Sequence, residues 1–186
     1  MVLAPLAWVA LEVLYVHIER TTETIASGIQ VSPDPEIAVV VLQAPDAFLE
    51  RYLSFQRRVM GLPTPRVWRT LSLAPYSHRL TRTGTSSFEL EVVDGHWMSS
   101  PFETLFRRAT NPLLPGDSVD LGDMQADILE VDEVGPTRVK FRFDRSLDDH
   151  SLQFFAWQNQ RMERFSMPPV GGQRLIAWEP GPAALW

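Results

Sequence analysis

The sequence predicts an α+β protein with a hydrophobic N-terminal helix, one β–loop–α unit and a mainly antiparallel β domain that contains one short helix. Three observations predict this class. An apolar stretch fills residues 2–18. A β-branched run at residues 36–44 is followed by helical spacing over residues 47–60. From residue 66 onward, apolar residues recur mainly at every second position, which is the period of a strand.

Composition bounds the size of the protein and excludes some functions. The 186 residues, 45% hydrophobic and 22% charged, suffice for one domain with a real core. A net charge of −6 and a pI near 5.2 argue against a nucleic-acid partner. The chain has no cysteine, which excludes disulfides, thiolate metal sites and cysteine nucleophiles.

Residues 2–18 read VLAPLAWVALEVLYVHI, with Glu12 and His17 the only ionisable side chains. About 17 apolar residues is the shortest helix that spans a bilayer. The stretch is therefore a membrane span, a helix buried on a soluble domain, or an interfacial helix. A cleaved signal peptide fits poorly, because no basic residue precedes the stretch. We expect residues 1–30 to form this hydrophobic helix, ending at Gly28, as an anchor or the last span of a longer parent.

Residues 31–186 are expected to form a soluble α+β domain, which begins after a proline-rich linker. The run at residues 36–44 is typical of a strand covered on both faces. Asp46 is the expected N-cap of the helix that follows, and Gly61 and Pro63 end it. The expected buried stripe of this helix is Leu49, Tyr52, Leu53, Gln56, Val59 and Met60.

The rest of the domain is expected to be strands, apart from a short helix that starts with a capping box at Ser100 to Glu103. Strands are expected at residues 66–73, 78–83, 86–93, two within 115–144, then 152–157, 161–167 and 173–178. In two of them, alternation predicts one buried face each: Phe88, Leu90 and Val92, and Val139, Phe141 and Phe143.

The order of several segments resembles an uncharacterised bacterial family. These segments are VVVLQAPDAFLERY, GLPTP, RTLS, SPFETLFR, PGDSVDLGDMQADILEV, RVKFRFDRSLDD and LQFFAWQNQRMERFSMPPVG. Similar stretches form the C-terminal soluble region of bacterial membrane proteins, after hydrophobic spans. The resemblance covers roughly residues 36–178 and rests on structural marks, so it implies a membrane location but no catalytic residue.

The densest polar cluster lies in DRSLDDHS, with the side chains of Asp144, Asp148, Asp149 and His150. Oxygen-rich clusters can bind Ca²⁺ or Mg²⁺, and a histidine can add a transition-metal ligand. The spacing does not match an EF-hand, and the segment has no glycine to allow a tight bend. These residues therefore favour a charged turn between two strands over a metal site.

Other chemistry-bearing residues are weaker candidates. A hydrolytic site could in principle use Asp94, His96, Ser99 and Ser100, but no G-x-S-x-G elbow is present and Ser100 has a capping role. His17 and His78 are isolated. Trp68, Trp97, Trp157 and Trp178 could line a ligand groove, although core positions are more typical of tryptophan in a small β domain.

From these residues we assign no catalytic, cofactor-binding or metal-binding side chain, and we expect no cofactor. The favoured function is a non-enzymatic interaction or scaffolding domain of a bacterial membrane protein. It would contact the membrane through residues 2–18, display its domain outside the cytoplasm and bind a protein partner, with no nucleic acid. The alternatives are a small soluble enzyme and a tryptophan-lined ligand-binding β domain, either of which could be cytoplasmic.

Overall fold

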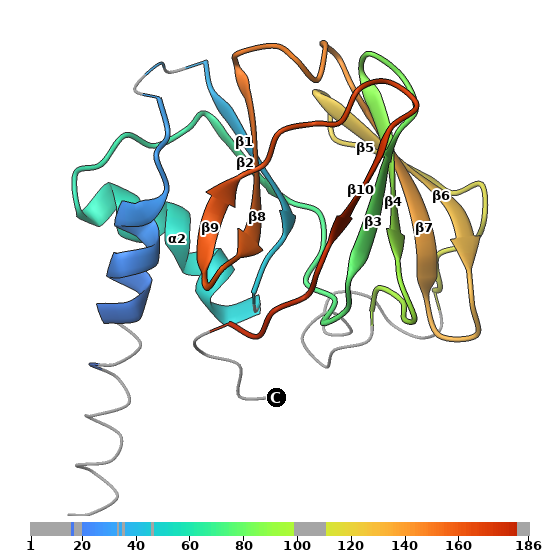
Figure 1. Cartoon of the computed structure of the whole chain (residues 1–186), viewed down its shortest axis with the longest axis horizontal. Helices are drawn as coiled ribbons and strands as arrows, with labels where there is room; N and C mark the ends of the chain where they lie inside the picture. The colour runs from blue at the N-terminus through green and yellow to red at the C-terminus, as the bar shows by residue number, and fades with distance from the viewer. Residues whose placement is uncertain are drawn as a thin grey trace, which may run out of the picture.

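The computed structural model describes residues 16, 20–32, 34, 36–45, 47–98 and 111–181, with the backbone alone for residues 47–52. Two helices cover one face of a four-stranded sheet, and a six-stranded sheet lies on its other face (Figure 1). The predicted α+β class with mainly antiparallel strands is confirmed. The short helix expected after Ser100 and the stretch at residues 2–15 lie outside the described residues.

The four-stranded sheet has the order β2-β1-β8-β9. Its strands are β1 (Ala38–Gln43), β2 (Val67–Thr70), β8 (Leu152–Gln158) and β9 (Arg161–Arg164). As predicted, β1 is buried along its whole length. Within this sheet β1 is parallel to both β2 and β8, a pairing that the sequence did not specify. The helix between β1 and β2 returns the chain to the starting end of the sheet, as in a βαβ crossover.

That helix is α2 (Ala47–Val59), and Gly61 follows it with φ of +68°. Its predicted ending is confirmed, since a positive φ suits glycine after a helix. Its predicted buried stripe is partly wrong. Leu53 is fully buried, but Val59 and Met60 are 64% and 39% exposed. The buried position in the last turn belongs instead to Arg57, which contacts the first helix.

The six-stranded sheet has the order β10-β3-β4-β7-β6-β5 and is antiparallel throughout. Its strands are β3 (His78–Arg82), β4 (Ser87–Val92), β5 (Ser118–Asp120), β6 (Met124–Val131), β7 (Pro136–Phe143) and β10 (Gln173–Ile176). Residues 115–144 therefore hold three strands, where two were predicted. The missed reversal lies at Gly122, which has φ of +86° and donates its amide to Asp120.

The main core lies between the two sheets, and the predicted alternation is confirmed there. All six predicted side chains are buried: Phe88, Leu90, Val92, Val139, Phe141 and Phe143. The Phe88 ring stacks on Phe143 at 5.9 Å and meets the edge of Phe154, from the other sheet, at 6.1 Å. These aromatic contacts join the two sheets.

A second core lies between the helices and the four-stranded sheet. Residues 20–28 are helical, so the predicted end at Gly28 is confirmed. Ile25, Ala26 and Ile29 pack against Phe155 and Trp157 of β8. None of the helices in the described part of the chain is long and apolar enough to span a bilayer.

Candidate functional site: a groove between the first helix and the β8–β9 hairpin

One wall of the groove is the β8–β9 hairpin. Asn159 and Gln160 have φ of 52° and 59°, so they form the two-residue type I′ turn that suits the twist of a hairpin. Both of their amides donate to the carboxylate of Glu179, at 3.2 and 3.1 Å. The chain near residue 179 thus holds this turn in place.

The opposite wall is the helix at residues 20–28. Its position depends on Arg57, whose Nη1 donates to the carbonyl oxygens of Ala26 at 2.6 Å and Ile29 at 2.7 Å. These are carbonyls that the end of a helix leaves without partners. Inside the helix, the Thr24 hydroxyl donates to the Arg20 carbonyl at 2.8 Å. The helix is therefore fixed to α2 at its C-terminal end.

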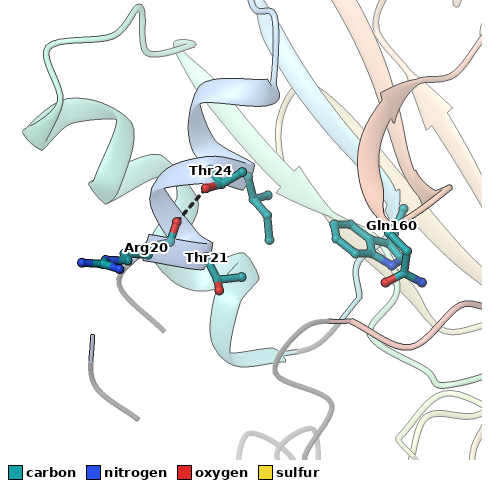
Figure 2. A pocket seen from close by; sticks show the side chains of 6 residues that line it. Arg20, Thr21, Thr24 and Gln160 are labelled. Atoms are coloured by element: carbon teal, nitrogen blue, oxygen red, sulfur yellow. Dashed lines mark hydrogen bonds between the residues drawn. The ribbon is translucent and has the colours of Figure 1, made fainter. Parts of the chain in front are cut away.

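A pocket of about 350 Å³ lies between these walls, lined by Arg20, Thr21, Thr24, Ile25, Trp157 and Gln160. Figure 2 shows Thr21 and Gln160 on opposite sides of it, and Arg20 pointing away from the hairpin. Trp157 itself is 2% exposed, and its Nε1 donates to the Pro180 carbonyl at 3.4 Å. The pocket thus presents hydroxyl and amide groups above an apolar base.

A second hollow, of about 450 Å³, adjoins β9 near the C-terminal end of the same helix. It is lined by Gly28, Gln30, Phe155, Arg161, Met162, Glu163 and Arg164. Its one carboxylate belongs to Glu163, and hydrogen bonds from Arg161 and then Asn159 lower the pKa of that group. Glu163 therefore stays ionised at neutral pH and is a poor general acid.

The chemistry of this groove suits binding. Its lining offers two threonine hydroxyls, amides, arginines and apolar surface, without a histidine. The only carboxylate is held by an arginine. Such a lining can bind an extended chain through polar contacts, but it contains no nucleophile paired with a base.

The predicted polar cluster at Asp144 to His150 is dispersed among separate partners. Asp148 accepts hydrogen bonds from Nη1 and Nη2 of the buried Arg82 guanidinium, at 2.9 and 2.6 Å, and this hydrogen bonding lowers the pKa of Asp148. Asp144 pairs with Arg145, and Asp149 accepts the hydroxyl and amide of Ser151. Across the ranges that the structure describes, no three His, Asp or Glu side chains gather as a metal site.

The candidate hydrolytic residues Asp94, His96, Ser99 and Ser100 do not form a complete site in the described part of the chain. His96 Nδ1 lies 2.7 Å from Asp132 Oδ2, so its partner is Asp132 and not Asp94, the aspartate of the weak candidate set. Burial raises the pKa of Asp132, but the amides of Gly135 and Val134, together with His96, outweigh burial and lower it. Ser99 and Ser100 lie outside the described residues. The structure therefore supplies an oriented histidine and leaves its nucleophile unassigned.

His78, which the sequence showed only as an isolated histidine, is fully buried. Its Nε2 lies 2.7 Å from the Ser72 hydroxyl, and its ring meets Trp97 edge-on at 5.7 Å. The hydroxyl also accepts the Ala74 amide, which favours donation of its own hydrogen to Nε2. Nδ1 then carries the ring proton near the Tyr76 carbonyl, although no complete hydrogen bond forms there. Burial lowers the pKa of His78 to about 4, so the ring is neutral at pH 7.

The tryptophans do not form one groove. Trp97 belongs to the core between the sheets and Trp157 to the core under the helices, while Trp68 packs at the margin of the latter. Of the four, Trp157 alone lines one of the two hollows described above. The groove residues on the first helix carry no motif, and only tertiary packing brings them opposite the hairpin. Comparison with protein-family models, with curated proteins and with solved structures found no match to this chain.

Proposed function

We propose that this chain is a non-catalytic interaction domain of a bacterial membrane protein. Residues 2–18 would hold it at the membrane, and the domain would be displayed outside the cytoplasm. One observation carries the proposal: the helix at residues 20–28, which directly follows the apolar stretch in the sequence, forms one wall of the groove. A partner bound there would sit close to the anchored end of the domain.

Outside the groove, ionisable side chains that could serve in catalysis are paired with one another or buried, which supports a binding role. Asp148 neutralises Arg82, and His78 is sealed in the core. The groove instead combines exposed arginines with apolar surface, and arginine beside buried aromatic groups is common in protein interfaces. The expected ligand is therefore a protein segment and not a small charged metabolite.

The membrane part of the proposal is tested with the full chain. Val9→Lys together with Val13→Lys places two charges in the apolar stretch, and each charge is costly inside a bilayer. We expect wild type to float with lipid vesicles and the variant to remain in the aqueous fraction. Val134→Lys with Val170→Lys is the matched control, since both valines are exposed. Equal flotation of all three proteins would contradict anchoring by residues 2–18.

Display outside the cytoplasm is tested by labelling. The chain has no cysteine, so Val134→Cys introduces a single thiol at a side chain that is 62% exposed. A membrane-impermeant maleimide should label this variant in bacterial spheroplasts before lysis. Labelling only after lysis would place the domain in the cytoplasm.

One observation favours a second function, hydrolysis. A carboxylate held by two amides orients His96, which resembles the relation between the acid and the histidine of a hydrolytic triad. If His96 acts as a base, His96→Ala should abolish the hydrolysis of an activated ester by the purified chain. The same slow rate in wild type and variant excludes this function.

A further inference from the structure

β9 is the last strand of its sheet, and within the described part of the chain half of its backbone groups have no strand partner. A two-residue turn makes Gln158 and Arg161 the first hydrogen-bonded pair of the hairpin. Such pairs recur at every second residue, which agrees with the bond of 2.8 Å from the Phe165 amide to the Phe154 carbonyl. The amides and carbonyls of Met162 and Arg164 therefore point away from β8, toward an open edge.

The side chains of β9 alternate in chemistry. Met162 is buried in the core under the helices. Arg161 and Glu163 lie on the opposite face, and Arg161 Nε donates to Glu163 Oε1 at 2.7 Å. Among the described residues, Arg164 is exposed and forms no ion pair. The edge thus carries one basic and one acidic side chain on a single face.

We propose that β9 is a self-association strand, which pairs antiparallel with β9 of a second copy of this chain around Met162. The inference rests on the proposed interaction function and names its partner. In this register Met162 lies opposite Met162 of the second copy, and Arg161 lies opposite its Glu163. The two sheets then form one continuous sheet across a twofold axis.

Backbone geometry and charge together select this register. Hydrogen-bonded pairs must join residues whose backbone groups both point outward, so even-numbered residues of β9 pair only with even-numbered residues. A shift by two residues in one direction places Glu163 opposite Glu163 of the second copy. A shift in the other direction places Arg161 opposite Arg161 of the second copy. Like charges directly opposite each other are unfavourable, whereas opposite charges stabilise a pair. Only the register centred on Met162 places opposite charges face to face.

The edge is accessible to a second strand. The hollow of about 450 Å³ beside residues 161–164 leaves space between β9 and the chain at Gly28 and Gln30. Charged residues on an edge strand often prevent pairing. In β9 the charged residues disfavour other registers and other strands but allow one pairing, because the charges of one copy complement those of the other in a single register.

The register is tested with single cysteines in the full chain, purified in mild detergent. Chains that carry Arg161→Cys and Glu163→Cys, with tags of different mass, are mixed under mild oxidation. In the proposed dimer, residues 161 and 163 of opposite copies form a non-hydrogen-bonded pair. The Cα atoms of such a pair lie about 4.5 Å apart, within reach of a disulfide. We expect the mixed disulfide to form at least about tenfold faster than either homodisulfide. The second Arg161–Glu163 pair of the mixed dimer keeps both native charges.

Charge reversal gives an independent readout in sedimentation experiments corrected for detergent. Glu163→Arg places arginine opposite arginine, and the dimer fraction should fall roughly tenfold, since two symmetric pairs change sign. Arg161→Glu combined with Glu163→Arg restores opposite charges and should restore the dimer. Glu36→Arg is the control, because Glu36 also forms an exposed ion pair with an arginine, away from β9.

Two results would overturn the inference. One is a wild-type chain that stays monomeric at all concentrations without a preferred mixed disulfide. The other is a dimer that the charge reversals leave unchanged. If flotation and surface labelling succeed while both of these assays fail, the proposed membrane location stands and self-association through β9 is excluded.

Discussion

The side chain of Arg57 in α2 closes the end of a different helix, by donating to the Ile29 carbonyl at 2.7 Å. It also donates to the carbonyls of Ala26 and Pro63. The side chain is 2% exposed, and burial lowers the pKa of Arg57. These acceptors are all neutral backbone carbonyls, so this buried cation acts as a cap that joins two helices.

Replacing this cap should destabilise the domain strongly. Arg57→Ala leaves buried carbonyls without a donor, and we expect a loss of about 2–4 kcal/mol in the free energy of unfolding. Arg58→Ala removes the neighbouring, exposed arginine and should change it by less than about 0.5 kcal/mol. Urea denaturation of both variants measures the difference. Equal midpoints would show that the cap contributes nothing.

The alternation of β7 predicts unequal effects for two adjacent residues. Phe141 is buried and its ring lies 5.5 Å from Phe88, so Phe141→Ala should cost about 3–5 kcal/mol. Arg142 faces outward and pairs with Asp127 at 2.8 Å. Because exposed ion pairs contribute little, Arg142→Ala should cost about 1 kcal/mol at most. Thermal unfolding of the two variants tests the pattern, and a reversed order would contradict it.

Buried His78 should make the fold sensitive to mild acid. Its folded-state pKa of about 4 lies below the value near 6.5 of an unfolded histidine. The unfolded chain therefore binds more protons between these values, so stability is complete above about pH 6.5 and is lost as the pH falls toward 4. The loss from this one group is at most roughly 3 kcal/mol.

The test compares the pH dependence of wild type and His78→Gln from urea unfolding between pH 7 and 4. The variant has no titrating ring at this position, so its stability should fall less steeply over this range. The carboxylates titrate in both proteins and cancel in the comparison. Parallel curves would show that His78 is not protected from protonation.

Local patterns in the sequence were sufficient for most of the elements. The β-branched run predicted β1, and the alternation around Phe88 and Phe141 predicted which side chains are buried. Gly61 correctly marked the end of α2. These features depend on a few neighbouring residues, because strand and helix periods are properties of the local backbone. The reversal at Gly122 was missed since its short edge strand, β5, is exposed and has no apolar period.

The partners of the polar residues could not be read from the sequence. Arg57 lies 28 residues from Ile29 along the chain, and Arg82 lies 66 residues from Asp148. Asp132 was not predicted as the partner of His96, because the pair is joined across separate strand ends. A hydrogen bond depends on distances of about 3 Å, which only the packed fold establishes between distant residues.

The sequence alone determined the class of the protein, the position of most strands and the burial of their alternating side chains, because these follow from local periodicity and the removal of apolar surface from water. Tertiary structure alone decided that β1 is parallel to β2 and β8, that the first helix and the hairpin enclose a groove, and that β9 is left at an edge. These features arise from contacts between residues that are distant in the chain, and such contacts have no local signature.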